Sequence, residues 1–205
     1  MTGWAGSPGN IWHNQEETSM KSPSLFTSIA LIGTGILSII EIYALQVDNH
    51  YKYDGLILLA TLWLLYSARR TLHLHPIHFA LAVVFLIAHN AGVFGAYEHT
   101  FLTISYDTYV HTYFGLVAGL ISLRAWHRHN TSPWAYIVIP MILLLLSVGH
   151  ELLEIVGAQL FGPGQGVFRI GPGDLGRLDT VLDLRNNLLG TILAFFVYQI
   201  PYSRS

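Results

Sequence analysis

The sequence contains no cysteine. This absence excludes disulfide bonds, thiolate metal sites and cysteine nucleophiles. Charged side chains are also scarce, at 11% of the 205 residues, whereas a soluble domain usually carries about 25%. The net charge is only -2 and there is no basic run, so nothing indicates nucleic-acid binding. Hydrophobic residues instead make up 52% of the chain, which predicts a protein solvated by lipid.

Long hydrophobic runs divide the chain into a membrane domain with polar ends. We predict an all-α polytopic membrane protein, with six transmembrane helices in one bundle at residues 24–200. A polar N-terminal tail at 1–23 and a C-terminal tail at 201–205 flank this domain. Crossing roughly 30 Å of hydrocarbon takes about 20 helical residues, so the second run is marginal. The six runs are 24–46, 53–68, 76–97, 106–126, 133–161 and 179–200.

Basic residues predict the orientation of these helices. Cytoplasmic loops of membrane proteins are enriched in lysine and arginine. If the N-terminal tail is cytoplasmic, that side holds six basic residues outside the spans and the opposite side holds three. We therefore expect both termini to be cytoplasmic. The inner set is Lys21, Arg69, Arg70, Arg124, Arg128 and Arg204, and the outer set is Lys52, Arg169 and Arg177.

Acidic residues gather on the opposite side. All Asp and Glu residues except Glu16 and Glu17 fall on the predicted outer loops or in the outer halves of helices. Acidic residues contribute little to orientation, so this segregation is independent information. An ionised side chain inside a span costs about 2.5 to 3.5 kcal/mol. The buried carboxylates must therefore be paired, protonated, hydrated or bound to metal, which predicts a polar site that opens to the extracytoplasmic face.

Histidines accompany these acids at helical spacing. Asp107 and His111 are four residues apart and share one helix face. A divalent metal ion would satisfy carboxylates and neutral imidazoles together, and a set without sulfur favours zinc, iron or manganese. The candidate catalytic residues are Glu154, as general base, and Asp179. The predicted metal ligands are Asp107, His111, His150, Glu151, Glu154 and Asp183.

Structural roles would also explain these residues. Asp107 and Asp179 precede apolar runs, where aspartate commonly caps a helix N-terminus. Asp183, Glu151 and Glu154 lie too far inside their helices for capping, but could pair with Arg185 or with each other. His89 could form hydrogen bonds between helices. The segment HELLE at 150–154 shares only its first two residues with the HExxH metalloprotease helix, because a glutamate occupies the position of the second histidine.

Two loop regions carry weaker signals. The segment LHLHPIH at 72–78 flanks the basic inner loops, where contact with lipid headgroups explains its histidines. The loop at 162–176 contains GPG twice but fits neither glycine pattern that binds phosphate. It is interpreted either as a cover over the outer site or as a plain connection.

Three segments resemble an uncharacterised bacterial inner-membrane family of the YjdF type. They are YDTYVHTYFGL at 106–116, HELLEIVGAQLFG at 150–162 and DTVLDLRNNLLG at 179–190. The resemblance implies a six-span fold in the bacterial inner membrane. The residues that match the polar positions of the family's motifs, and that the resemblance therefore implies as site residues, are Asp107, His111, Glu151, Glu154, Asp179 and Asp183. The last part of the chain is also similar to VanZ-like membrane proteins, through Glu154, Arg169 or Arg177, Asp183, Asn187 and Gly190.

Two classes of function follow from these residues. The first is a membrane-embedded metal-dependent enzyme, either hydrolase or oxidoreductase, that acts on an amphiphilic or lipid substrate at the extracytoplasmic side. The second is an ion or proton-coupled transporter that uses the same carboxylates as a relay. A transport pathway would also need ionisable residues in the inner half, and no inverted repeat is apparent. We therefore favour the enzyme, with membrane lipids as its surroundings.

Overall fold

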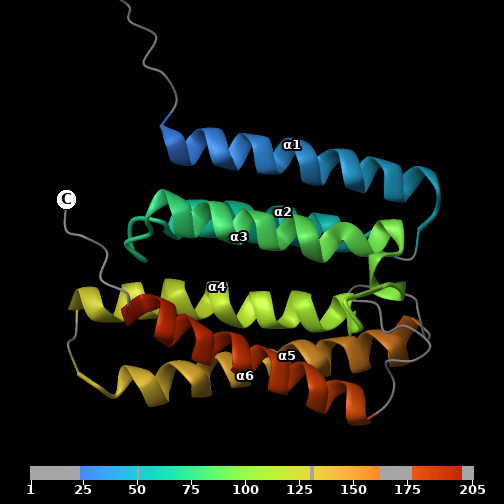
Figure 1. Ribbon diagram of the computed structural model, residues 1–205. Coiled ribbons are helices and arrows are strands. Elements are labelled where there is room, and N and C mark those ends of the chain that lie inside the picture. Colours follow the sequence, from blue (N-terminus) through green and yellow to red (C-terminus); the bar gives the residue numbers. More distant parts are fainter. Residues whose placement is uncertain (1–23, 50, 130–131, 162–176, 200–205) are drawn as a thin grey trace, which may run out of the picture.

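The computed structural model describes residues 24–49, 51–129, 132–161 and 177–199. Within these residues six α-helices run alternately up and down in one bundle, which confirms the predicted all-α fold (Figure 1). The predicted N-terminal tail, the glycine-rich loop and the C-terminal tail lie outside the described residues. The helices are α1 (Leu25–Gln46), α2 (Asp54–Ala68), α3 (Pro76–His89), α4 (Tyr106–His129), α5 (Ala135–Phe161) and α6 (Arg177–Gln199).

Polar side chains set the helix starts. The Ser24 hydroxyl accepts a hydrogen bond from the Thr27 amide at the start of α1. Ser105 does the same for the Thr108 amide at the start of α4, at 3.3 Å. Each bond satisfies an amide that lacks a partner within the helix. Since Ser105 caps α4, the capping interpretation of Asp107 is wrong, and its carboxylate is free for another role.

The connection between α3 and α4 departs from the predicted third helix. The α-helix ends at His89, and two short 3-10 helices follow, η1 (Asn90–Phe94) and η2 (Ala96–Glu98). Gly95 separates them with φ of 75°, a left-handed conformation that glycine adopts without strain. A small hairpin of β1 (Thr100–Phe101) and β2 (Ile104–Ser105) then leads into α4. The chain therefore turns back over the helix ends instead of continuing as a straight helix to residue 97.

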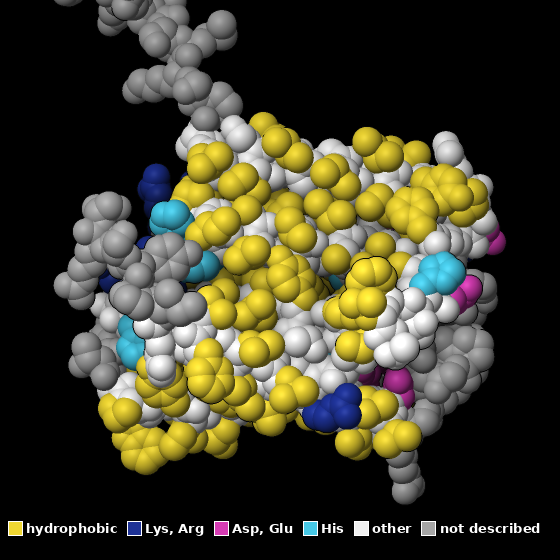
Figure 2. All heavy atoms as spheres, viewed as in Figure 1, with side chains coloured by type: hydrophobic (Ala, Val, Ile, Leu, Met, Phe, Trp, Pro, Cys, Tyr) yellow, Lys and Arg dark blue, Asp and Glu magenta, His cyan; other side chains and the backbone are white. Residues whose placement is uncertain are grey.

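The outer faces of the bundle are apolar. Four segments are long and apolar enough to cross a membrane: Leu25–Gln46, Pro76–Phe94, Ala135–Gly157 and Leu178–Gln199. Helix α2 is apolar but has only 15 residues, in line with its predicted marginal length. Large side chains such as Ile39 and Leu145 are 69% and 70% exposed, as expected for contact with lipid. Figure 2 shows this apolar surface between two polar ends.

Helix α4 lies in the middle of the bundle, against α3, α5 and α6 (Figure 1). Its closest neighbour is α6, because glycines allow the two backbones to touch. A Cβ atom on Gly115 would lie 2.0 Å from the Asn187 carbonyl oxygen, and one on Gly190 would lie 2.0 Å from the Thr112 carbonyl oxygen. These glycines therefore permit the close packing of α4 against α6. Polar side chains of α4 and α6 are thereby brought together.

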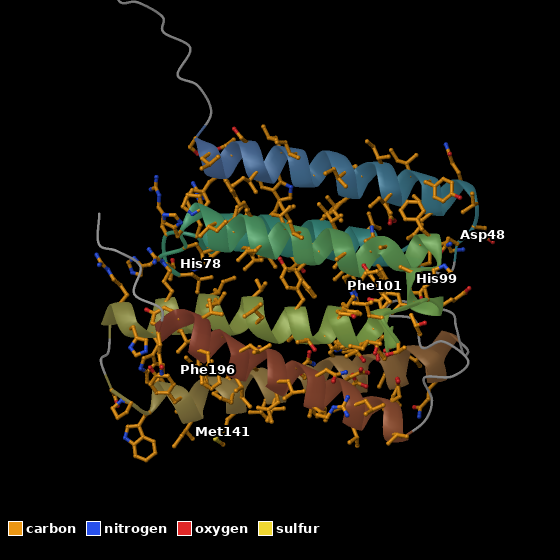
Figure 3. The ribbon with its side chains drawn as sticks, in the orientation of Figure 1. Asp48, His78, His99, Phe101, Met141 and Phe196 are labelled. Atoms are coloured by element: carbon orange, nitrogen blue, oxygen red, sulfur yellow. The ribbon has the colours of Figure 1, made fainter. Side chains whose placement is uncertain are left out.

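Charge is segregated between the two ends of the bundle. Among the described residues, every Asp and Glu lies toward the end where α1 leads into α2 and α4 begins, which we call the acidic end. The opposite end, the basic end, carries Arg69, Arg70, Arg124 and Arg128. In Figure 3, Asp48 and His99 mark the acidic end and His78 marks the basic end. Helix α1 begins at the basic end, and helix α6 ends there (Figure 1).

Candidate metal centre

Three of the predicted ligands meet at the acidic end, between α4 and α6. Asp107 and His111 are one turn apart on α4, and Asp183 approaches them from α6. His111 Nε2 lies 3.3 Å from Asp107 Oδ1 and 3.5 Å from Asp183 Oδ1. One potential ligand atom from each residue lies within 4.8 Å of the other two. We call these three residues the acidic-end triad.

The distances within the triad match those between ligands of a small metal ion. Zinc binds histidine nitrogen and carboxylate oxygen at about 2.0 to 2.2 Å, so tetrahedral ligands lie about 3.4 Å from one another. The two distances from His111 Nε2, 3.3 and 3.5 Å, agree with this value. The triad could therefore hold a cation with only small side-chain movements, leaving a fourth position for water or substrate.

Burial makes Asp183 the critical member of the triad. The residue is only 4% exposed, and its Oδ1 atom makes no hydrogen bond to any described residue. The carboxyl groups of Asp107 and Asp183 also lie close enough for their charges to interact. Two carboxyl groups so close cannot both stay ionised without a proton or a cation between them. Asp107 remains 30% exposed in its side chain, so the triad can be reached from the Asp107 side.

Arg185 does not supply the missing positive charge. Its side chain is exposed and donates hydrogen bonds to Asn186 Oδ1 at 3.0 and 3.2 Å. Among the described residues it forms no ion pair with an acid. The sequence-based alternative that Asp183 pairs with Arg185 is therefore wrong. Of the described groups, His111 is the one that faces Asp183 as a potential cation.

Helix α5 places the remaining predicted ligands beside the triad, but not in it. His150 Nε2 lies 3.2 Å from Glu154 Oε1, one turn along the same helix. Glu151 is 5% exposed and contacts the Thr180 hydroxyl of α6. Its carboxylate is close enough to His111 for their charges to interact. Glu151 is thus a neighbour of the triad, whereas His150 and Glu154 form a separate pair.

Asp179 lies in the first turn of α6 and is partly buried. It is one turn before Asp183, and the charges of the two carboxylates interact. Its position adds negative charge to the acidic end on the same helix face as the triad. Asp179 therefore lies near the triad, and its catalytic role stays a prediction.

A small cavity of about 180 Å³ adjoins the triad and the His150 pair. Three histidines reach it from three different helices: His89, His111 and His150. The rings of His89 and His150 are 6.3 Å apart. Most of the other lining side chains are apolar, and they include Phe85 and Phe114. The cavity thus joins imidazole groups to an apolar space, which suits a substrate with both polar and apolar parts.

Tyr97 is a site residue that the sequence analysis did not identify. Its hydroxyl lies 2.8 Å from His89 Nδ1 and so fixes the histidine ring, which lines the cavity. Burial and the nearby Asp107 charge raise the pKa of Tyr97 well above its usual range, so it remains a neutral phenol. No local pattern indicated this contact, because it depends on the left-handed turn at Gly95.

Two asparagines of α6 form hydrogen bonds to the neighbouring helices close to the acidic-end triad. The Asn187 side chain donates to the Ser147 hydroxyl of α5 at 2.9 Å. Asn186 donates to the Thr108 hydroxyl of α4 at 3.4 Å. Both asparagines are buried, and they bridge α6 to its two neighbours. The spacing of Asp183 and Asn187, four residues apart, was the sequence signal that both would lie on one face.

Comparison with known proteins gives one match. A family model described as "Predicted membrane protein (DUF2238)" matches residues 25–203. The match covers all six helices and agrees with the predicted fold of an all-α polytopic membrane protein. It is also consistent with the resemblance to YjdF-type proteins, whereas the similarity to VanZ-like proteins stays a prediction. No curated protein and no solved structure matches the chain significantly.

Proposed function

This chain belongs to the family of predicted membrane proteins DUF2238, and within that setting we propose that it is a membrane-embedded metal-dependent enzyme. The acidic-end triad would bind one divalent cation, either zinc, iron or manganese. The observation that carries the proposal is the approach of Asp183 to His111, at 3.5 Å, in a buried space where its Oδ1 has no hydrogen bond from a described residue. A cation would satisfy both carboxylates and the imidazole together.

The chemistry of the proposed site is activation of water by the metal. A cation held by Asp107, His111 and Asp183 would supply a water of lowered pKa, which is a nucleophile near neutral pH. Glu154, held by His150 at 3.2 Å, would accept the proton of that water and return it to the leaving group. Asp179 would orient the water or a substrate hydroxyl. Iron held by the same three residues would instead supply dioxygen chemistry, for which an external electron donor would be needed.

The proposed substrate is amphiphilic or a lipid. The cavity of about 180 Å³ holds only part of such a molecule. Its histidines would contact the reacting polar group, and Phe85 and Phe114 would contact the adjoining carbons. The exposed apolar faces of the bundle would hold the protein in the lipid bilayer, where such a substrate is also dissolved. Membrane lipids are therefore both its surroundings and the source from which we expect substrate to enter.

We further propose a location in the bacterial inner membrane with both termini in the cytoplasm. The arginines at the basic end support this orientation, because lysine and arginine are enriched in cytoplasmic loops. The acidic end, with the triad, would then face the extracytoplasmic side. Substrates would reach the metal from the outer leaflet or from the space beyond it.

Elemental analysis of the purified protein tests the metal site. We expect about one equivalent of zinc, iron or manganese per chain in the wild type, and a loss of about tenfold or more in Asp107→Asn and His111→Gln, since each removes a ligand. Glu98→Gln is the matched control, because Glu98 is an exposed acid at the same end. Metal-free wild-type protein after gentle purification, or variants that keep full occupancy, would contradict the proposal.

A proton-coupled transporter is the second candidate. The proximity of the carboxyl groups of Asp107 and Asp183 favours it, because two neighbouring carboxyl groups can share a proton, as in a relay. The absence of carboxylates at the basic end, among the described residues, argues against a relay across the whole membrane. Proteoliposomes with an internal pH dye separate the two. Proton flux that Asp183→Asn abolishes, in protein without metal, would favour transport.

A further inference from the structure

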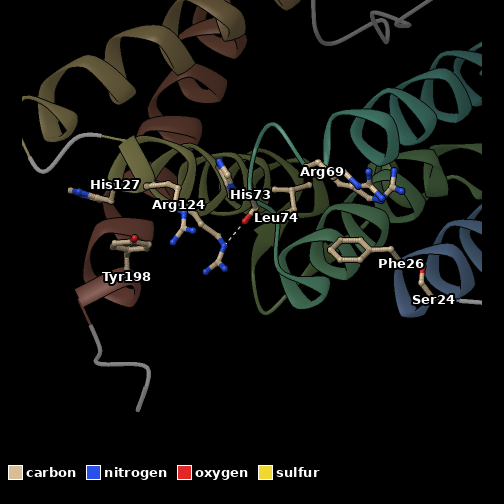
Figure 4. A pocket seen from close by; sticks show the side chains of 10 residues that line it. Ser24, Phe26, Arg69, His73, Leu74, Arg124, His127 and Tyr198 are labelled. Atoms are coloured by element: carbon tan, nitrogen blue, oxygen red, sulfur yellow. Dashed lines mark hydrogen bonds between the residues drawn. The ribbon is translucent and has the colours of Figure 1, made fainter. Parts of the chain in front are cut away.

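A large cavity opens at the basic end, far from the acidic-end triad. Its volume is about 870 Å³, and it lies between the start of α1, the α2–α3 connection and the ends of α4 and α6. Figure 4 shows Arg69 on one side of the space and Arg124 with His127 on the other. The cationic and imidazole side chains that line it are Arg69, Arg70, Arg124, Arg128, His73 and His127. We call this space the arginine pocket.

The arginine pocket has no counter-charge among the residues that the structure describes. No carboxylate lines it, and every described Asp and Glu lies toward the other end of the bundle. Four guanidinium groups in one concave space repel one another, and the repulsion is relieved when an anion enters. The enrichment of arginine in cytoplasmic loops explains positive charge at this end. It does not explain why arginines of the α2–α3 connection and of helix α4 line a single pocket.

Two of the arginines are held in place by the backbone. Arg124 Nε donates to the His73 carbonyl oxygen at 2.6 Å, which ties α4 to the α2–α3 connection. The Arg69 guanidinium lies 3.9 Å from the centre of the Tyr66 ring and donates to the Tyr66 carbonyl oxygen. Bonds of this kind orient the planar fork of each guanidinium before a ligand arrives. The remaining N–H groups are left to donate to an anion's oxygens.

We propose that the arginine pocket binds a phosphate-bearing anion. Phosphate is the anion whose oxygens match the guanidinium fork, and several arginines around one group are a common form of phosphate recognition. The pocket lies where the helices end. In a protein whose helices span the membrane this is the level of the lipid headgroups, so an anionic phospholipid of the adjacent leaflet can supply the phosphate. Free phosphate offers the same chemistry from the aqueous side. The pocket is separate from the proposed metal centre and does not depend on it.

Two binding experiments on the full chain test this proposal. Native mass spectrometry with added phosphatidylglycerol or phosphatidylcholine measures the headgroup preference, and titration calorimetry in phosphatidylcholine nanodiscs measures binding of inorganic phosphate. We expect wild-type protein to prefer phosphatidylglycerol, to bind phosphate, or both. The double variant Arg70→Gln/Arg128→Gln should weaken that binding about tenfold, since it removes two charges near the headgroup layer. No described hydrogen bond uses either side chain, so the fold should persist.

Arg185→Gln is the matched control, because it removes an exposed arginine outside the pocket. Its binding should stay within about twofold of the wild type. Binding of phosphatidylglycerol alone would identify the ligand as a headgroup, and binding of inorganic phosphate would identify a free anion. Wild-type protein that neither binds phosphate nor distinguishes the two lipids would overturn the proposal. Equal weakening by Arg185→Gln would also overturn it, since the effect would then come from net charge.

Discussion

Replacing Gly190 with alanine is expected to separate α4 from α6 and to lower the free energy of unfolding by about 3 kcal/mol. The new Cβ would lie 2.0 Å from the Thr112 carbonyl oxygen, and backbone atoms of a packed helix cannot move aside as a flexible side chain can. Gly115→Ala should act in the same way against the Asn187 carbonyl oxygen. Unfolding of the detergent-solubilised protein, followed by circular dichroism during titration with dodecyl sulfate, measures the change.

Gly149→Ala and Gly35→Ala provide matched controls with the opposite expected sign. Both glycines lie inside helices, and a Cβ on either would meet no atom within 4 Å. Alanine is a better helix former than glycine by about 1 kcal/mol, so these variants should be as stable as the wild type or more stable. Equal effects at Gly190 and Gly149 would show that helix propensity, and not contact between α4 and α6, controls stability. Metal content should fall in Gly190→Ala and not in the controls.

Asp183→Asn is expected to abolish stabilisation by metal without unfolding the metal-free protein. Asparagine keeps the shape of the side chain and removes a negative charge next to Asp107. The metal-free variant should therefore be as stable as the metal-free wild type. Added metal at about 100 times its dissociation constant should stabilise the wild type by about 2.7 kcal/mol, and the variant by almost nothing. Thermal unfolding with zinc, manganese or iron(II), and with a chelator, measures both quantities.

The comparison separates a metal site from a purely structural cluster. If the triad served only to hold α4 and α6 together, added metal would leave the wild-type midpoint unchanged. Loss of a structural contact would instead make Asp183→Asn less stable even in chelator. Glu98→Gln should respond to metal as the wild type does, because Glu98 is exposed and outside the triad. A metal response that Asp183→Asn retains in full would place the ligands elsewhere.

Much of the candidate site was visible in the local sequence. Asp107 and His111 are four residues apart on a helix, and helical geometry alone puts them on one face. The same rule pairs His150 with Glu154, which lie 3.2 Å apart. The sequence did not reveal that His150 and Glu154 would contact each other instead of joining the acidic-end triad. That outcome depends on how α5 is rotated about its axis, which packing against α4 and α6 sets.

Contacts between distant segments were beyond the reach of the local pattern. Tyr97 reaches His89 because the third predicted helix ends early and turns back at Gly95. The arginine pocket was not predictable for the same reason. The sequence showed basic residues near the inner loops, but not that Arg69 and Arg124 would line one cavity. In each case a turn of the chain lies between the residues that meet. The local sequence does not determine the direction of such a turn, because tertiary packing decides it.

Composition alone determined that this chain is an all-α membrane protein, because lipid selects long apolar helices whatever their order in space. The same sequence also determined which end would be acidic and which basic, since charge position follows from helix order. Only the tertiary structure decided that Asp183 would meet His111. The physical reason is the contact of α4 with α6 at Gly115 and Gly190, where two backbones approach more closely than any larger side chain permits.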